Sequence, residues 1–288
     1  MTIVIISSNT DPASINIKNH LLQATPWQEV SSFCSNPVFR LTQIPSIYLV
    51  TINDNKIFHE NIDKEIQKHL HIHPSTAIFL SRHRSQSAIP SLSVHPIGNY
   101  GDAEFGGKSQ TLVYAEPIFM SNLLRIIKKN VPSSLDDYQI CFEVTHHGPY
   151  LDIPTLFVEI GSTEKQWNDP HLGKIIGQSI LELLQTTKRE NKKFMPIVVG
   201  VGGGHYAPRF TDVVFEKNVA FGHMIPKYHI KQGNIDIQFY KNALEKTPNV
   251  QGVYIHKKSF KKSEVSQLKE LFGNYDIAVL SSKEFSNR

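Results

Sequence analysis

Histidines follow several apolar runs of the chain at the point where each run ends, and this is the first chemical signal in the sequence. His83 follows one run, His146 and His147 follow a second, and His205 comes after the glycines that end a third. Glu159 lies inside a fourth. Imidazole and carboxylate groups that are brought together can bind Zn²⁺ or transfer protons during hydrolysis. The coincidence of several such ends, more than any single histidine, predicts a site for hydrolysis.

Two mechanisms are open on these residues alone. In the first, histidines and a carboxylate hold Zn²⁺ with one free position, where water is activated. In the second, a histidine acts as general base and the amides of a glycine-rich loop stabilise an oxyanion. A covalent mechanism is disfavoured because the chain has no Gly-x-Ser-x-Gly elbow and Cys34 lies in a segment without features of a site.

The glycine-rich loop belongs to residues 196–211, PIVVGVGGGHYAPRFT. A β-branched apolar run stops at Gly202, Gly203 and Gly204, and a His, a Tyr and an Arg follow within a few residues. Glycine permits positive φ and close approach of a ligand to the main chain, whose N–H groups can face an anion. A dinucleotide site is disfavoured because the third glycine of that fingerprint is missing and Pro208 follows where the helix should begin.

Short apolar strands that alternate with helices are expected to position these residues. This order predicts an α/β fold with a largely parallel, mixed sheet flanked by helices, and a site off the carboxyl ends of the strands. Strands are expected at 2–8, 46–52, 77–80, 138–145, 154–160, 196–201, 252–255 and 275–280. Helices are expected from Asp11-Pro12 onward and at 61–70, 111–129, from 168 onward, 235–246 and 263–271.

Three segments have weaker patterns. Residues 27–42 are expected to form a loop with at most a short strand at 38–41, and residues 213–221 are expected to be strand-like. Residues 85–107 are rich in Ser, Pro and Gly, and they are expected to form a long irregular loop. A loop of this length in a compact domain is usually functional.

Composition places the chain among globular proteins. It has 288 residues, of which 40% are hydrophobic and 19% charged, and no apolar run is long enough for a membrane helix. The N-terminus has the pattern of a first strand rather than a signal peptide, and two cysteines cannot form a disulfide framework. We expect a cytoplasmic protein with a single domain over residues 1–288, in which the part after about residue 230 is a candidate C-terminal subdomain.

The net charge of +4 is compatible with a nucleic-acid partner but does not establish one. Basic residues cluster at Arg82 and Arg84, at Lys192 and Lys193, and in residues 257–262, KKSFKK. The last cluster has an aromatic residue between its lysines, as in surfaces that hold a nucleic-acid backbone. Taken alone, it is more typical of a solvated surface.

Several motifs in matching order resemble the archaeal and plant type of D-aminoacyl-tRNA deacylase over nearly the whole chain. They are 79–85 (FLSRHRS), 92–99 (LSVHPIGN), 145–149 (THHGP), 157–164 (FVEIGSTE), 200–211 (GVGGGHYAPRFT) and 221–224 (FGHM). The resemblance implies hydrolysis of the ester between a D-amino acid and the tRNA 3′ end, a proofreading role in translation and a zinc requirement. It also implies a fold related to phosphorylases and peptidyl-tRNA hydrolases, and action on aldehyde-modified D-aminoacyl-tRNAs.

The resemblance also implies roles for individual residues. The catalytic candidates are His146, His147, His205 and Glu159. The candidate zinc ligands are His83, His146, His205 and His223. The candidate substrate contacts are Arg82, Arg84, His95, Gly202, Gly203, Gly204, Tyr206 and Arg209. In this scheme Tyr206 or Phe210 stacks on the terminal adenine and the arginines contact phosphate.

Two alternatives to this function are kept. One is a peptidyl-tRNA hydrolase-like or phosphorylase-like hydrolase that acts on another ester, amide or glycosidic bond. The other is a tRNA-binding protein without catalysis, which would need a basic stripe with aromatic residues but no clustered histidines. In the favoured hypothesis the partner is the aminoacylated 3′ end of tRNA, no DNA or membrane partner is expected, and the protein is expected to be a monomer.

Overall fold

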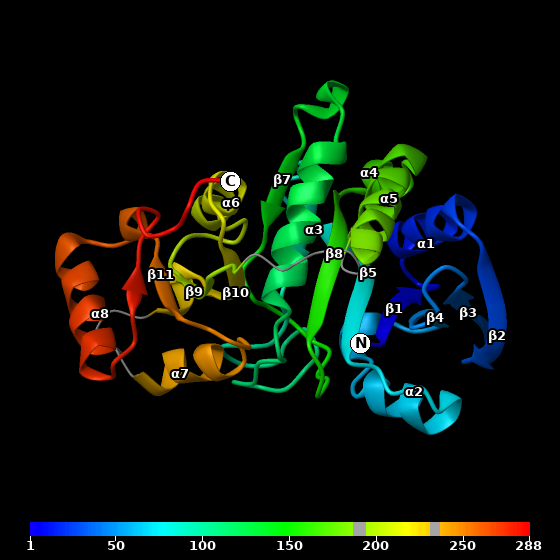
Figure 1. Ribbon diagram of the computed structural model, residues 1–288, viewed down its shortest axis with the longest axis horizontal. Coiled ribbons are helices and arrows are strands. Elements are labelled where there is room, and N and C mark those ends of the chain that lie inside the picture. The colour runs from blue at the N-terminus through cyan, green and yellow to red at the C-terminus, as the bar shows by residue number, and fades with distance from the viewer. Residues whose placement is uncertain (187–193, 231–236) are drawn as a thin grey trace.

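The computed structural model describes residues 1–186, 194–230 and 237–288 as a mixed α/β fold with two sheets side by side (Figure 1). The larger sheet has the strand order β2-β3-β4-β1-β5-β8-β6-β7, and the smaller has the order β10-β9-β11-β12. Strands span Ile3–Ser8 (β1), Trp27–Phe33 (β2), Asn36–Leu41 (β3), Ile47–Ile52 (β4), Thr76–Arg84 (β5), Ser91–His95 (β6), Gln139–Phe142 (β7), Thr155–Ser162 (β8), Ile197–Val201 (β9), Ala220–Ile225 (β10), Gly252–Ile255 (β11) and Val279–Leu280 (β12). The predicted α/β class is confirmed.

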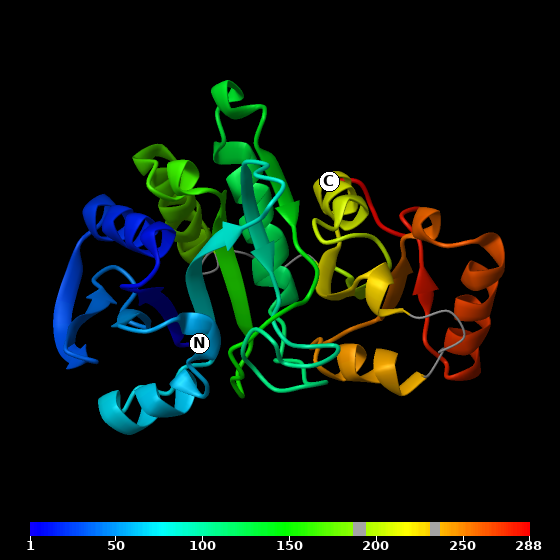
Figure 2. The ribbon, with the colours of Figure 1, turned by 180° about the vertical axis from the view of Figure 1, so that it is seen from behind.

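Helices cover the larger sheet unequally. The apolar faces of α1, α3 and α5 pack on one side of it in the main hydrophobic core, whereas α2 packs on the other side in a smaller core. Figure 2 shows the two sheets from behind, with α7 and α8 beside the smaller sheet. Helices span Pro12–Ala24 (α1), Ile62–Leu70 (α2), Pro117–Asn130 (α3), Glu164–Trp167 (α4), Pro170–Thr186 (α5), Pro208–Glu216 (α6), Ile237–Glu245 (α7) and Lys262–Asn274 (α8).

Strand direction in the larger sheet changes between β8 and β6. Strands β4, β1, β5 and β8 are parallel to one another, but β6 pairs with β8 in the antiparallel sense and then with β7 in the parallel sense. The four strands of the smaller sheet are all parallel. The sheet is therefore mixed and largely parallel, as predicted.

Three of the weaker predictions are wrong. Residues 27–42 form the hairpin of β2 and β3, not a loop. The short strand expected at 38–41 is part of β3, but β2 was missed because most of it is exposed and it carries no apolar alternation. The long loop at 85–107 contains β6, a strand too short for a periodic signal. Residues 213–221 are not a strand, because α6 begins with Pro208 in its first turn and continues to Glu216, before β10. Pro208 therefore starts a helix, although we expected no helix to begin at this position.

The smaller sheet begins at β9, so it includes residues well before position 230.

The two sheets are joined by backbone hydrogen bonds at the segment after β7. Val144 N–H donates to the carbonyl of His205 at 2.9 Å, and Thr145 N–H donates to the carbonyl of Met224 at 3.1 Å. The histidines that follow β7 and β9 are therefore held next to each other by the main chain. The division of the chain into domains stays a prediction.

Candidate active site

One face of the larger sheet carries buried polar side chains at its centre. Ser81 of β5, Glu159 of β8 and Ser93 of β6 are neighbours in the strand register, so their side chains lie on the same face. His83 and His95 lie two residues further along β5 and β6, on this face as well. Because β5 and β6 run in opposite directions, the two histidines lie on opposite sides of Glu159. The site therefore lies on the face of the sheet, and the expected position off one common edge is corrected.

A second carboxylate, Glu143, completes this group, and it was not singled out from the sequence. It is fully buried one residue after β7, and its Oε2 lies 3.2 Å from His83 Nδ1, 2.9 Å from His205 Nε2 and 3.6 Å from His146 Nε2. The hydroxyl of Ser93 donates a hydrogen bond to its Oε1. A charged residue in the apolar run 138–145 was the signal that could have identified it.

Glu159 has a smaller set of partners. Its Oε2 lies 3.3 Å from His83 Nδ1 and 3.6 Å from His95 Nε2. The His83 ring is therefore placed between two buried carboxylates. Burial would lower the pKa of His83, but Glu143 and Glu159 outweigh it and raise that pKa to about 11. Burial would likewise raise the pKa of Glu143, but the hydrogen bonds from His205 and His83 hold it well below its ordinary value.

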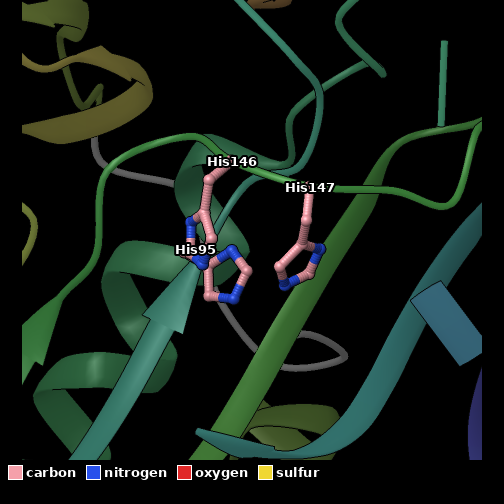
Figure 3. A group of neighbouring side chains, drawn as sticks. All are labelled: His95, His146 and His147. Carbon is pink, nitrogen blue, oxygen red and sulfur yellow. The ribbon is translucent and has the colours of Figure 1, made fainter. Parts of the chain in front are cut away.

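His95, His146 and His147 form a second group beside the carboxylates (Figure 3). His95 comes from the end of β6, and the other two come from the loop after β7. The ring centroid of His146 lies 4.3 Å from that of His95 and 4.4 Å from that of His147. One ring nitrogen of each histidine lies within 4.8 Å of the corresponding nitrogens of the other two.

Main-chain carbonyls fix the ring orientation of two of these histidines. His146 Nδ1 lies 2.7 Å from the carbonyl of Val144, and His147 Nδ1 lies 2.6 Å from the carbonyl of Gly148. A carbonyl only accepts, so each Nδ1 carries the proton and each Nε2 presents a lone pair. Burial lowers the pKa of His147 to about 4 and that of His146 well below its ordinary value, so both rings are neutral near pH 7.

These neutral rings fit a metal ion. His95 Nε2 is buried, and among the described residues it has no hydrogen-bond partner, because Glu159 is 3.6 Å away. A buried imidazole nitrogen without a partner, beside two imidazoles with free Nε2 lone pairs, suits Zn²⁺, which prefers nitrogen ligands. The hydrogen bonds from Nδ1 to main-chain carbonyls are the second contacts that metal-binding histidines commonly make. The residues present therefore fit a zinc ion. Of the ligands predicted from the sequence, only His146 belongs to this group, whereas His83 and His205 form another group with Glu143.

The two groups open on a cavity of about 1240 Å³. Its walls include His83, His146, His147, His205 and Glu159, and also cationic and aromatic side chains. The cationic residues are Lys56, Arg82 and Arg84, and the aromatic residues are Tyr100, Phe105, Trp167 and Tyr228. The His205 side chain is 36% exposed, so a substrate in this cavity can reach it.

Comparison with known proteins matches this chain to one family over most of its length. The sequence profile described as D-aminoacyl-tRNA deacylase matches residues 70–280. The chain belongs to the D-aminoacyl-tRNA deacylase family. A D-aminoacyl-tRNA deacylase of Thermococcus onnurineus is 37% identical over 90% of this chain and 92% of its own length. One of Methanosarcina mazei is 36% identical over 98% of this chain and 93% of its own length.

A solved structure supports the same fold for this deacylase. The crystal structure of AF0625, described as a conserved protein of unknown function, superposes with a TM-score of 0.85 at 28% sequence identity. It covers 99% of this chain and 98% of its own. No helix within the described parts of the chain is long and apolar enough to cross a membrane.

The structure of this deacylase brings most of the predicted residues together but removes His223 from the candidate zinc ligands. The ring is fully buried in β10, with Nε2 2.8 Å from the carbonyl of Val113 and Nδ1 3.0 Å from the hydroxyl of Thr145. Thr145 Oγ1 accepts a hydrogen bond from Met224 N–H, so the Thr145 hydroxyl is the donor in its hydrogen bond to His223 Nδ1. Both ring nitrogens are occupied, and burial lowers the pKa of His223 to about 4. His223 is a neutral core residue.

Some of the predicted substrate contacts lie at the cavity and others do not. Arg82 and Arg84 line the cavity, whereas His95 and Tyr206 do not. His95 is fully buried, and the hydroxyl of Tyr206 lies 3.2 Å from His83 Nε2. Arg209 does not line the cavity, because its guanidinium donates to the hydroxyls of Tyr254 and Ser282. Phe210, predicted as an alternative stacking residue, is fully buried against the Phe221 and Tyr254 rings and cannot reach an adenine.

The N–H groups of Gly202 and Gly203 form hydrogen bonds within the protein and are not free to bind an anion. Gly202 N–H donates to the carbonyl of Ile225 at 2.8 Å, and Gly203 N–H donates to Ser259 Oγ at 2.9 Å. Gly202 has φ of +101°, and a Cβ there would lie 2.5 Å from the Phe260 ring. Gly204 is exposed, and none of the three lines the cavity. The loop therefore positions His205, and the predicted substrate contacts at these glycines are corrected.

Proposed function

We propose that this protein hydrolyses the ester of D-aminoacyl-tRNA at a zinc ion held by His95, His146 and His147. Membership of the deacylase family makes the chain a hydrolase that acts on this ester. The observation that carries the zinc proposal is the convergence of three imidazoles, two with fixed free Nε2 lone pairs and one buried without a partner. Zinc, when bound, would supply a Lewis acid that activates water near neutral pH.

We infer that His205, with Glu143 behind it, moves a proton of the attacking water. Glu143 Oε2 lies 2.9 Å from His205 Nε2, at ion-pair distance, so we infer that Nδ1 is the nitrogen that takes up the proton. A buried carboxylate behind an imidazole orients the ring and stabilises its charged form. The His83 ring lies between Glu143 and Glu159 and offsets part of their negative charge.

The cavity suits the end of a charged tRNA. Arg82 and Arg84 would contact phosphates of the terminal nucleotides, since guanidinium groups match phosphate geometry. The aromatic walls offer surfaces on which the terminal adenine stacks. A protein with this substrate acts where tRNA is used, so we extend the proposal to a cytoplasmic protein, and to one that works as a monomer.

Release of D-amino acid from charged tRNA tests the assignment. We expect His147→Ala and His205→Ala to abolish release while circular dichroism shows an unchanged fold. His171→Ala, at an exposed position of α5, is the matched control and should keep full activity. Wild-type turnover in either site variant would refute the proposed roles. Faster cleavage of an N-blocked L-peptidyl-tRNA than of D-aminoacyl-tRNA would favour the hydrolase alternative instead.

Elemental analysis of the purified protein tests zinc separately. We expect one zinc ion per chain, loss of activity after chelation, and recovery when Zn²⁺ is returned. His146→Ala should reduce the zinc content, whereas His171→Ala should not. Full activity of metal-free protein would exclude the zinc proposal and leave the mechanism with a histidine base.

A further inference from the structure

An exposed basic segment lies outside the cavity, at residues 257–262, which follow β11 and end at the first residue of α8. We call it the lysine segment. Lys257, Lys258, Lys261 and Lys262 are all exposed. None of the four forms an ion pair with a described residue, whereas Lys64, Lys129 and Lys227 each pair with an acidic side chain. Four exposed lysines within six residues give this surface an attraction for an anionic partner.

The lysine segment contacts the loop that presents His205. Gly203 N–H donates to Ser259 Oγ at 2.9 Å, and the Phe260 ring occupies the space where a side chain at Gly202 would lie. His205 follows only two residues after Gly203. The segment is therefore fixed against the backbone that carries a wall residue of the cavity.

A second connection runs through Lys227. Its N–H donates to the carbonyl of Gly203 at 2.9 Å, and its Nζ lies 4.3 Å from the centroid of the Phe260 ring. The next residue, Tyr228, lines the cavity. The lysine segment thus adjoins the wall of the cavity that Tyr228 and His205 form.

We propose that the lysine segment holds the phosphate backbone of the tRNA acceptor stem while the 3′ end occupies the cavity. This inference rests on the proposed function and adds a docking surface to it. The cavity takes only the end of the tRNA, so the acceptor helix that continues from it must lie on the protein surface nearby. Double-stranded RNA is recognised largely by its phosphates and shape, and lysines that contact phosphates release counterions. A surface of unpaired lysines beside the cavity matches that partner in charge and position.

Two substrates of different length separate docking from catalysis. One is the full D-aminoacyl-tRNA, and the other is a D-aminoacyl ester of a short single-stranded 3′-terminal oligonucleotide. The test variant changes Lys257, Lys258 and Lys262 to Gln. The control changes Lys68, Lys128 and Lys174 to Gln, three exposed lysines on the helices around the larger sheet. Both variants lose the same net charge.

We expect the test variant to raise KM for the full tRNA about tenfold or more, with kcat and cleavage of the short substrate unchanged. The slope of log(kcat/KM) against log[salt] should become shallower by up to about 2.7, since each phosphate contact contributes roughly 0.9 in duplex DNA. The control variant should behave like wild type on both substrates. Equal KM values for the full tRNA in the two variants would overturn the docking site, as would an equal loss on the short substrate.

Affinity for uncharged tRNA is measured in parallel, because it does not depend on turnover. If the wild type cleaved neither substrate, the proposed function would fail, while weaker tRNA binding by the test variant alone would still support the docking site. Unchanged affinity of the test variant would overturn the docking site whatever the activity. If the lysine segment bound an acidic protein instead, the affinity of the test variant for tRNA would be unchanged.

Discussion

Replacement of Glu143 by Gln tests whether the buried carboxylate organises the site. The amide keeps the shape of the side chain but removes the charge that faces His83 at 3.2 Å and His205 at 2.9 Å. Removing one partner of a buried ion pair costs about 3–5 kcal/mol, because the other charge is left without compensation. We expect Glu143→Gln to lower the free energy of unfolding of the metal-free protein by about 3 kcal/mol or more at pH 6. Hydrolysis should fall by roughly 10²–10⁴-fold, the usual contribution of a positioned acid–base group.

The pH dependence of this loss has a definite sign. The pKa of His83 is raised to about 11 in the folded protein, so its contribution to stability is complete below its ordinary value of 6.5 and is lost as the pH rises toward 11. In Glu143→Gln only Glu159 still faces His83, so the pKa of His83 is raised less. The contribution of His83 to stability is therefore lost at a lower pH than in the wild type. The difference in stability between the two proteins should therefore be smaller at pH 9 than at pH 6, by about 1 kcal/mol.

Urea unfolding of chelator-treated protein at pH 6 and pH 9 measures both effects. Glu182→Gln is the control, because Glu182 is a partly exposed carboxylate that pairs with Lys129, and it should change stability by less than about 1 kcal/mol. The reasoning would be refuted if Glu143→Gln were within about 1 kcal/mol of wild type at pH 6. A difference that grew with pH would refute the role assigned to His83.

Two other substitutions probe the corrected assignments. His223→Ala should destabilise the protein by about 1–3 kcal/mol in chemical unfolding, because the buried carbonyl of Val113 and hydroxyl of Thr145 lose their partner, but it should leave the zinc content unchanged. Loss of zinc in that variant would return His223 to the ligands. Gly202→Ala should destabilise by about 1–3 kcal/mol in thermal unfolding, because φ is +101° and the Phe260 ring fills the space for a Cβ. Gly204→Ala has open space around it and is the control, so equal losses in the two variants would contradict this account.

The sequence predicted those parts of the structure in which a local pattern determines the outcome. Asp11 caps α1 by accepting from Ser14 N–H, with Pro12 in the first turn, as its position before an apolar helix suggested. The buried strands β1, β4 and β8 followed from continuous apolar runs. The edge hairpin was missed because an exposed strand needs no apolar alternation.

The candidate site was predicted less completely, because its membership depends on contacts between distant parts of the chain. The sequence identified His146, His147 and His205 from their positions after apolar runs. It could not show that His223, in a similar position, has both ring nitrogens occupied by Val113 and Thr145. Local sequence shows where a side chain stands along an element, whereas its remaining hydrogen-bonding capacity depends on tertiary partners.

The opposite directions of β5 and β6 explain how two buried histidines come to lie beside one buried carboxylate, Glu159. In an all-parallel sheet His83 and His95 would come from strand ends at one solvent edge. Here they lie on opposite sides of Glu159, so Oε2 of each carboxylate has an imidazole nitrogen within 3.6 Å. The partly exposed His205 is held beside this group by the hydrogen bond from Val144 N–H to the main-chain carbonyl of His205.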